Sequence, residues 1–273
     1  MLGHVVVAVS LSASSLIAPE VPPVPRVMAA LGDSISAGFN ACGWFVACPS
    51  RSWSAGEHAG ISSHYVRLGM KGGNRNFAVP GATSADLAGQ VRQAVAVRAE
   101  YVTVLLGAQD ACKASEREMT PVAVYRARMA KALWALRDGL PGVRVFVASV
   151  PDLRRLWETG KDNAIARMFW KVGRICPSML ASPTSVKKAD VDRRARVRAR
   201  VMAYNRVLAE VCAQFGPACR TDSGAVFGYP FTLEHISKWD FFHPNEAGQR
   251  ALAKATFAKG FEWAPSPALR EHG

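Results

Sequence analysis

Five short apolar runs, separated by longer segments with helical periodicity, constrain the fold of this 273-residue chain more than any other feature. They occupy residues 27–31, 76–79, 101–106, 143–150 and 219–226. Runs of this length and composition are typical of buried strands. Strands that alternate with helices form a parallel sheet with helices on both faces. We therefore predict an α/β fold built on a central five-stranded parallel sheet.

The segments between these runs carry the expected helices. Residues 191–213 give the clearest pattern, because Val197, Val201, Tyr204, Leu208 and Val211 recur at spacings of four, three, four and three. That spacing places them on one face of a helix. Further helices are predicted over 84–98, 121–137, 163–173 and 246–259, the last with Asn245 as its N-cap.

The chain is strongly basic, with 34 Lys and Arg against 21 Asp and Glu, a formal charge of +13. Such a balance favours weak contact with anionic lipid or acidic cell-wall polymer. The other face of helix 191–213 would provide it, through Arg193, Arg194, Arg196, Arg198 and Arg200. An ordinary solvated basic surface explains the charge equally well. We expect no nucleic-acid partner, because the sequence has no recognisable motif and no interleaving of basic and aromatic residues.

The N-terminus resembles a secretory leader. Residues 5–18 are apolar and small, and residues 19–25 are proline-rich. No basic residue precedes the apolar run and no clear cleavage site follows it, so an uncleaved arm or a misplaced start is the alternative. No run reaches the roughly 18 apolar residues of a membrane-spanning helix. We predict a secreted protein with a leader and linker over 1–25, one domain over 26–262 and a tail over 263–273.

Six cysteines fit an oxidising compartment. None forms a C-x-x-C pair, so we expect no metal site. Six thiols can pair in many ways. The short separations favour Cys42 with Cys48 and Cys212 with Cys219, which leaves Cys112 with Cys176. Six reduced, buried thiols are the alternative.

Short polar segments follow the first three apolar runs, and a fourth lies between the fifth run and the last helix. They are Gly32-Asp33-Ser34, Pro80-Gly81-Ala82-Thr83, Gly107-Ala108-Gln109-Asp110 and Asp240-Phe241-Phe242-His243. Ligands of parallel sheets bind beyond the carboxyl ends of the strands, so these segments should meet at one edge. Each has an ordinary explanation as a loop, turn or helix-capping residue, and only their combination points to chemistry.

That combination suits nucleophilic catalysis. A serine hydroxyl needs a base, and His243 would take the proton of Ser34. Asp240, three residues before the histidine, would orient the imidazole and stabilise its charged form. The backbone N–H groups of Ser34 and Gly81, with the side-chain amide of Gln109, are candidate donors to an oxyanion.

The same segments resemble the sequence blocks of the SGNH (GDSL) hydrolases. They read AALGDSISAGF (29–39), NFAVPGATSADL (76–87), LLGAQDAC (105–112) and WDFFHPNEAGQ (239–249). The resemblance implies a three-layer α/β/α fold, no cofactor, and ester hydrolysis through an acyl-enzyme. The cysteine pattern and PDLRRLW (151–157) resemble the secreted actinobacterial branch. One position departs from the family pattern: the third block usually carries Asn where this chain has Gln109.

Two aromatic segments, 40–60 and 151–183, could line an acyl pocket, although core packing explains most of their residues as well. We expect a monomeric carboxylesterase or lipase acting on an acyl lipid or a small acyl ester. A polysaccharide O-acetylesterase of the same fold is the alternative. A third possibility is a surface protein that keeps the fold for binding, with its chemistry weakened at Gln109.

Overall fold

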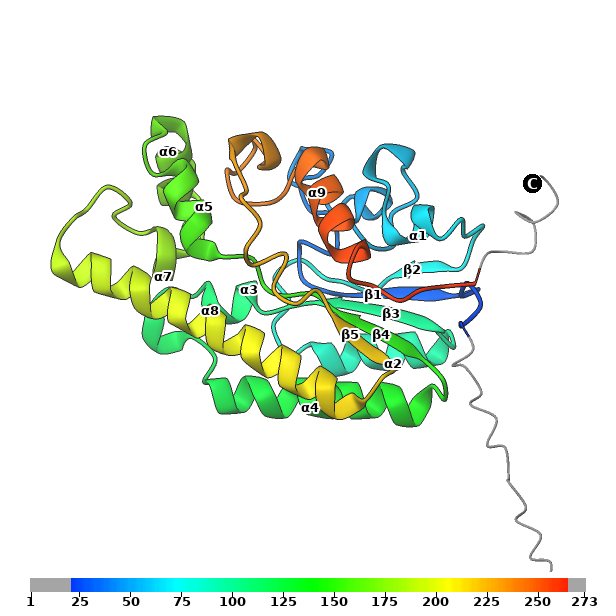
Figure 1. Cartoon of the computed structure of the whole chain (residues 1–273). Coiled ribbons are helices and arrows are strands. Elements are labelled where there is room, and N and C mark those ends of the chain that lie inside the picture. The colour runs from blue at the N-terminus through cyan, green and yellow to red at the C-terminus, as the bar shows by residue number, and fades with distance from the viewer. Residues whose placement is uncertain (1–20, 265–273) are drawn as a thin grey trace, which may run out of the picture.

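The computed structural model describes residues 21–264, and its centre is a five-stranded sheet in which all strands run parallel (Figure 1). The strand order is β2-β1-β3-β4-β5. The strands are β1 (Met28–Gly32), β2 (Asn74–Asn76), β3 (Tyr101–Leu105), β4 (Arg144–Val147) and β5 (Cys219–Thr221). The predicted five-stranded parallel sheet is confirmed.

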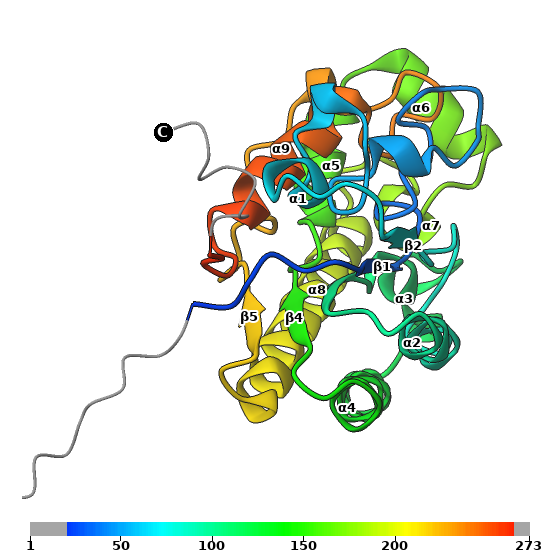
Figure 2. The same ribbon diagram turned by 90° about the vertical axis from the view of Figure 1, so that its right-hand side faces the viewer.

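Helices cover both faces of the sheet (Figure 2). One face packs against α2 (Leu87–Ala96), α4 (Val122–Gly139) and α8 (Lys188–Phe215), and the other against α1 (His64–Arg67) and α9 (Glu246–Phe257). The segments that follow β3 and β4 form α3 (Ala108–Ala111), α5 (Leu153–Gly160), α6 (Ala164–Val172) and α7 (Pro177–Leu180). Short 3₁₀ turns occur at Pro49–Arg51, Ala59–Ile61, Glu116–Glu118 and Leu233–His235.

The central strands are buried along their whole length, as a doubly covered parallel sheet requires. Successive side chains alternate between the two cores. In β1, Ala29 and Leu31 join the core beneath α2, α4 and α8, whereas Met28 and Ala30 join the core beneath α1 and α9. The position of each residue in a strand therefore decides which helical layer it contacts.

The predicted strands differ most from the structure at the two edges of the sheet, and the inner strand β4 also ends earlier than predicted, at Val147 rather than at residue 150. The run at 76–79 overshoots β2, which ends at Asn76, because an edge strand is half-exposed and does not need an apolar sequence. The run at 219–226 is cut short at Thr221. The carboxylate of Asp222 accepts hydrogen bonds from the backbone N–H groups of Gly224 and Val226, which turns the chain.

The predicted helices are confirmed with small shifts of their ends. Helix α8 extends the predicted segment at both ends, and its apolar stripe is buried. Helix α9 begins after Asn245, whose side chain accepts a hydrogen bond from the N–H of Gly248, as predicted for its N-cap. Asn163 caps α6 in the same way.

All six cysteines are paired, as Cys42–Cys48, Cys112–Cys176 and Cys212–Cys219. The last two link α3 to the start of α7 and α8 to β5. The pairing is the one that the short separations favoured.

The apolar leader expected at residues 5–18 lies outside the described residues. The two ends of the described chain lie side by side, because the N–H of Ala264 donates to the carbonyl of Pro22 at 2.8 Å. Within residues 21–264, no helix combines the length and the apolarity needed to cross a lipid bilayer.

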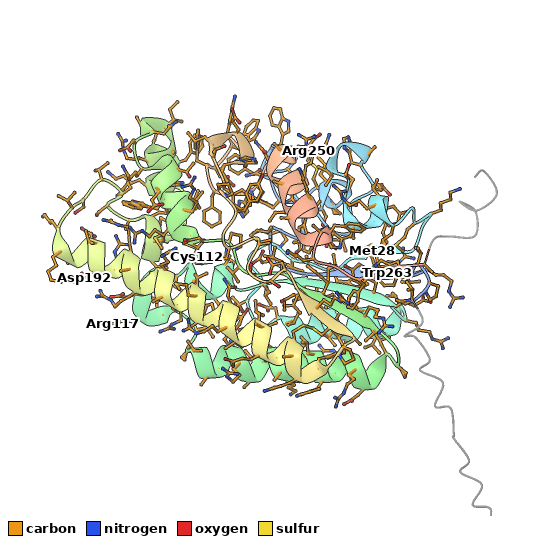
Figure 3. The ribbon with its side chains drawn as sticks, in the orientation of Figure 1. Met28, Cys112, Arg117, Asp192, Arg250 and Trp263 are labelled. Atoms are coloured by element: carbon orange, nitrogen blue, oxygen red, sulfur yellow. A yellow bond between two sulfur atoms is a disulfide. The ribbon has the colours of Figure 1, made fainter. Side chains whose placement is uncertain are left out.

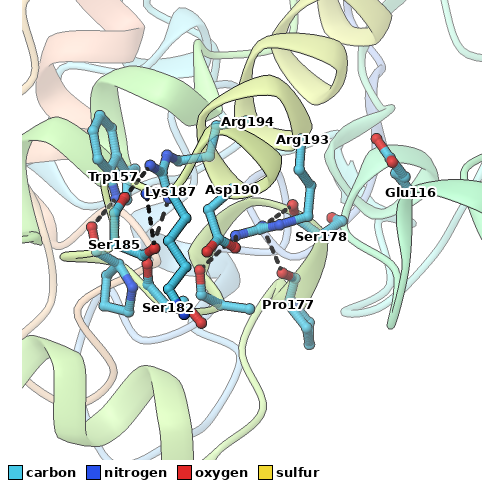
Figure 4. A network of polar contacts seen from close by, with 12 residues as sticks. Glu116, Trp157, Pro177, Ser178, Ser182, Ser185, Lys187, Asp190, Arg193 and Arg194 are labelled. Atoms are coloured by element: carbon cyan, nitrogen blue, oxygen red, sulfur yellow. Dashed lines mark hydrogen bonds and ion pairs between the residues drawn. The ribbon is translucent and has the colours of Figure 1, made fainter.

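The arginines between positions 193 and 200 of α8 contact groups of the same chain, as Figure 4 shows for Arg193 and Arg194. Arg193 donates to the carbonyls of Pro177, Ser178 and Ala181, and Arg194 lies over the ring of Trp157. Arg196 pairs with Glu116, Arg198 with Asp152, and Arg200 donates to the carbonyl of Thr120. These contacts fix α8 to its surroundings.

Candidate active site

Ser34 lies in a tight turn directly after β1. Gly32, at the end of the strand, has a φ of +146°, and a Cβ there would lie 2.2 Å from the carbonyl oxygen of Leu105. Only glycine fits this position. The side chain of Gln90 from α2 holds both backbone groups of Gly32, accepting from its N–H at 2.7 Å and donating to its carbonyl at 2.9 Å. The start of the turn is therefore fixed before the chain reaches Ser34.

The segment before α9 brings two side chains to this turn. The Oγ of Ser34 lies 2.8 Å from Nε2 of His243, and Nδ1 of His243 lies 2.6 Å from Oδ2 of Asp240. Ser34 is 4% exposed, and the side chain of His243 is 13% exposed. Residues more than 200 positions apart thus form one chain of hydrogen bonds at the carboxyl edge of the sheet.

Asp240 is buried, and all its oxygens accept hydrogen bonds. Oδ1 accepts from the backbone N–H groups of Phe242 and His243, while Oδ2 also accepts from Nδ2 of Asn40 at 2.5 Å. Burial alone would raise the pKa of the Asp240 carboxyl, but the bonds from His243 and the backbone lower that pKa below its usual value. The carboxylate therefore stays ionised. Sequence reasoning missed Asn40, which no motif marks.

This arrangement can move a proton off the serine. Because Asp240 accepts at Nδ1, the neutral imidazole carries its proton there, and Nε2 is free to accept the proton of the Ser34 hydroxyl. The carboxylate then stabilises the imidazolium that results.

The candidate oxyanion donors are free. In the part of the chain that the structure describes, neither the N–H of Ser34, the N–H of Gly81 nor the amide of Gln109 has a protein acceptor. Gly81 is exposed after β2, with a φ of +84°. Gln109 lies in the first turn of α3 and lines the same hollow as His243.

Two hollows meet at His243 and Phe242. The first, which we call the apolar pocket, has a volume of about 50 Å³ and contains Ser34. Its walls include Ile35, Leu153, Leu156, Phe231 and Ile236. The second, which we call the open groove, has a volume of about 530 Å³ and includes Phe39, Phe45 and Gln109.

The predicted acyl-pocket segments contribute to these hollows only in part. Segment 151–183 supplies residues of α5 to the apolar pocket, but Trp170, Met179 and Leu180 lie in the core instead. Segment 40–60 supplies Phe45 to the open groove and no wall residue of the apolar pocket. Trp53, in that segment, is fully buried in the core beneath α9.

A second buried carboxyl precedes the serine. Asp33 is fully buried; its Oδ1 accepts from the N–H of Ile35 at 3.0 Å, and its Oδ2 has no hydrogen-bond partner among the described residues. Burial raises the pKa of Asp33 to about 7, and the nearby Asp110 carboxylate adds to the rise, against the opposing effects of Ile35 and His243. No sequence signal marked this group as titratable near neutral pH.

Among the described residues, no three or more His, Cys, Asp or Glu side chains gather as a metal site would need.

An α/β fold with these three side chains at the carboxyl edge of its sheet matches a known class of hydrolases. The sequence profile of the GDSL-like lipase/acylhydrolase family matches residues 30–251. The chain belongs to this family.

Solved structures of similar fold come from several esterases. Phospholipase A1 from Streptomyces albidoflavus NA297 is 18% identical, with a TM-score of 0.55 over 86% of this chain and 100% of that one. The extracellular lipase of Streptomyces rimosus is 18% identical, with a TM-score of 0.52 over 86% and 99%. A single-substitution variant of an acetyl xylan esterase from Geobacillus stearothermophilus is 15% identical, with a TM-score of 0.54 over 90% and 99%. A comparison with curated proteins gave no match.

Proposed function

We propose that this protein is a serine ester hydrolase of the carboxylesterase or lipase type, which acts through an acyl-enzyme on Ser34. The observation that carries the proposal is the hydrogen-bonded chain from the Ser34 hydroxyl through His243 to Asp240. Membership of a lipase and acylhydrolase family supports it.

In the first half-reaction, His243 Nε2 accepts the Ser34 proton as Oγ attacks the ester carbonyl. The N–H groups of Ser34 and Gly81 and the amide of Gln109 donate to the oxyanion. His243 then gives its proton to the leaving alcohol as the carbon–oxygen bond breaks. In the second half-reaction, water loses a proton to His243 and attacks the acyl group, which releases the acid and restores the Ser34 hydroxyl.

The apolar pocket is the proposed acyl site, because it opens at Ser34 and its walls are mostly apolar. Its small volume also favours a second candidate, an O-acetylesterase of the same fold. Rates on p-nitrophenyl acetate, butyrate and octanoate separate the two. We expect butyrate and octanoate to react faster than acetate, and activity confined to acetate would favour the O-acetylesterase.

A fluorophosphonate probe tests the activity itself, because it labels only serines whose proton is taken by a base. We expect labelling of the wild type and none of Ser34→Ala. Ser36→Ala is the matched control, since it removes a buried hydroxyl two residues away and should leave labelling intact. Absence of labelling in the wild type would favour the third possibility, a binding protein weakened at Gln109.

We also propose that the protein is a secreted monomer of the actinobacterial branch, with a leader over 1–25, a hydrolase domain over 26–262 and a tail over 263–273. Three disulfides support an oxidising compartment. N-terminal sequencing of protein recovered from culture medium tests the leader, and light scattering after gel filtration tests the monomer. An intact Met1 or a larger mass would contradict these proposals.

A further inference from the structure

The open groove adjoins the apolar pocket at His243 and Phe242. Both hollows include His243 and Phe242, but Ser34 lines only the apolar pocket. In ester cleavage, the acyl group stays on the serine, and the alcohol leaves on the side from which the imidazole delivers a proton. If the acyl group fills the apolar pocket, the open groove is the space left for the alcohol.

Two cations line this groove without a counter-charge. Lys113 is half-buried, and Arg174 is exposed. Within residues 21–264, neither side chain has an ion-pair partner or a hydrogen-bond acceptor. The arginines between positions 193 and 200 of α8 differ, because each is paired with a carboxylate or bonded to backbone carbonyls. Cations left free beside a reactive centre are available to a ligand.

The backbone fixes the positions of both cations. Lys113 follows Cys112, which lies at the end of α3 (Figure 3) and is joined by a disulfide to Cys176, two residues after Arg174. Arg174 and Cys176 adopt φ values of +47° and +43°, so the chain turns sharply here. The N–H of Ser178 also donates to the carbonyl of Lys113 at 2.9 Å. The disulfide and this hydrogen bond hold the backbone of Lys113 and Arg174 at one end of the groove before any ligand binds.

The rest of the lining is compatible with an anion. Among the described residues that line the groove, Asp240 is the only one with a carboxylate, and its oxygens are fully occupied by Asn40, His243 and two backbone N–H groups. Phe39, Phe45 and Phe242 provide apolar walls. The groove therefore has a positively charged end and apolar walls that can contact the carbon atoms of a ligand.

We propose that the open groove binds an anionic alcohol portion of the substrate, so that the preferred esters join an apolar acyl group to an alcohol bearing a carboxylate or phosphate. This inference rests on the proposed esterase activity. The ammonium group of lysine is a compact positive charge, and the guanidinium group of arginine is a planar fork of donors. Together they can bind either a carboxylate or a phosphate.

The test compares three butyrate esters, of glycerol, of glyceric acid and of glycerol 3-phosphate. We expect kcat/KM at low salt to be roughly tenfold higher for an anionic ester than for the neutral one. Lys113→Met and Arg174→Met should each remove most of that advantage through KM and leave the neutral ester unchanged. Lys131→Met, an exposed lysine on α4, is the matched control. The two anionic esters distinguish a carboxylate from a phosphate substrate.

Equal kcat/KM for all three esters, or an equal loss on the neutral ester in both variants, would overturn the inference. Binding to Ser34→Ala separates this failure from failure of the esterase proposal. Calorimetry measures this binding, and we expect glycerol 3-phosphate or glycerate to bind the Ser34→Ala protein. Binding should weaken in the double variant that carries both Ser34→Ala and Lys113→Met. Hydrolysis of neutral esters without such binding would overturn the groove assignment alone.

Discussion

Asp33 shows how one buried group can set the pH response of the molecule. Its carboxyl directly precedes Ser34, is fully buried, and leaves one oxygen without a partner among the described residues. Burial raises its pKa from 3.8 to about 7. In the folded protein the group therefore keeps its proton over a range in which the unfolded chain has already released it.

The sign of the effect follows from this difference in bound protons. Between about pH 4 and pH 7 the folded state binds more protons at Asp33, so stability falls as the pH rises, by at most about 1.4 kcal/mol per unit. We predict that Asp33→Asn removes this slope. Urea unfolding of both proteins at pH 5, 6, 7 and 8 checks the result. Parallel profiles would show that Asp33 is ionised throughout.

Gln109 offers a second prediction for a single residue. Its amide is free to donate, but it stands one methylene further from the backbone than the usual Asn. Loss of one oxyanion donor costs about 10²–10³ in rate. We predict that Gln109→Asn raises kcat on p-nitrophenyl butyrate, by up to about that factor. An equal or lower kcat in this variant would show that the longer amide is already well placed.

At the scale of elements, the loop before α9 carries His243 and Asp240, and Asn245 anchors it. The side chain of Asn245 caps α9 through the N–H of Gly248 and also donates to the carbonyls of Glu234 and Ile236. Loss of an N-cap costs about 1 kcal/mol. We predict that Asn245→Ala lowers stability by that amount or more and also lowers kcat, measured by urea unfolding and ester hydrolysis.

Asn163→Ala is the control for this prediction. Asn163 caps α6 through the N–H groups of Ile165 and Ala166, so its loss should cost similar stability. Its side chain does not bond the loop of His243, although Trp170 of α6 donates to the carbonyl of Phe241 in that loop at 2.9 Å. We therefore expect a smaller fall of kcat than in Asn245→Ala, and an equal fall would show that the loop depends no more on Asn245 than on the stability of α6.

The sequence predicted the elements that have strong local patterns. Buried strands β1 and β3 are continuously apolar, and α8 has a long stripe, so their limits were nearly right. Edge strands β2 and β5 lack such patterns. Asn40 and Gln90 act through contacts with residues distant in sequence, so no local pattern marks them. His64 is another such residue, because its two ring nitrogens lie 2.7 Å and 2.8 Å from the hydroxyl oxygens of Tyr101 and Thr256, both distant in sequence.

At the scale of the whole molecule, the disulfides differ in how much chain they close. Cys112–Cys176 spans 64 residues, whereas Cys42–Cys48 and Cys212–Cys219 span 6 and 7. The entropy lost by the unfolded chain grows with the loop that a crosslink closes. Cys112–Cys176 therefore contributes most to overall stability.

We predict that Cys112→Ser with Cys176→Ser lowers the free energy of unfolding by about 4 kcal/mol. The double variant Cys212→Ser with Cys219→Ser should lose clearly less, because its loop is short. Both are measured by urea unfolding against the wild type. The reverse ranking would show that native packing around Cys212 outweighs the effect on the unfolded chain.

The side chain of Asn40 has a consequence for where the protein can work. Its Oδ1 accepts from the N–H of Phe45, within the loop that Cys42–Cys48 closes, while its Nδ2 bonds Asp240. The loop closed by this disulfide is thus two hydrogen bonds away from Asp240, the carboxylate that supports the imidazole. Mild reduction of this bridge should slow turnover before the fold is lost. In that case the protein would turn over more slowly in a thiol-rich cell interior than in oxidising surroundings.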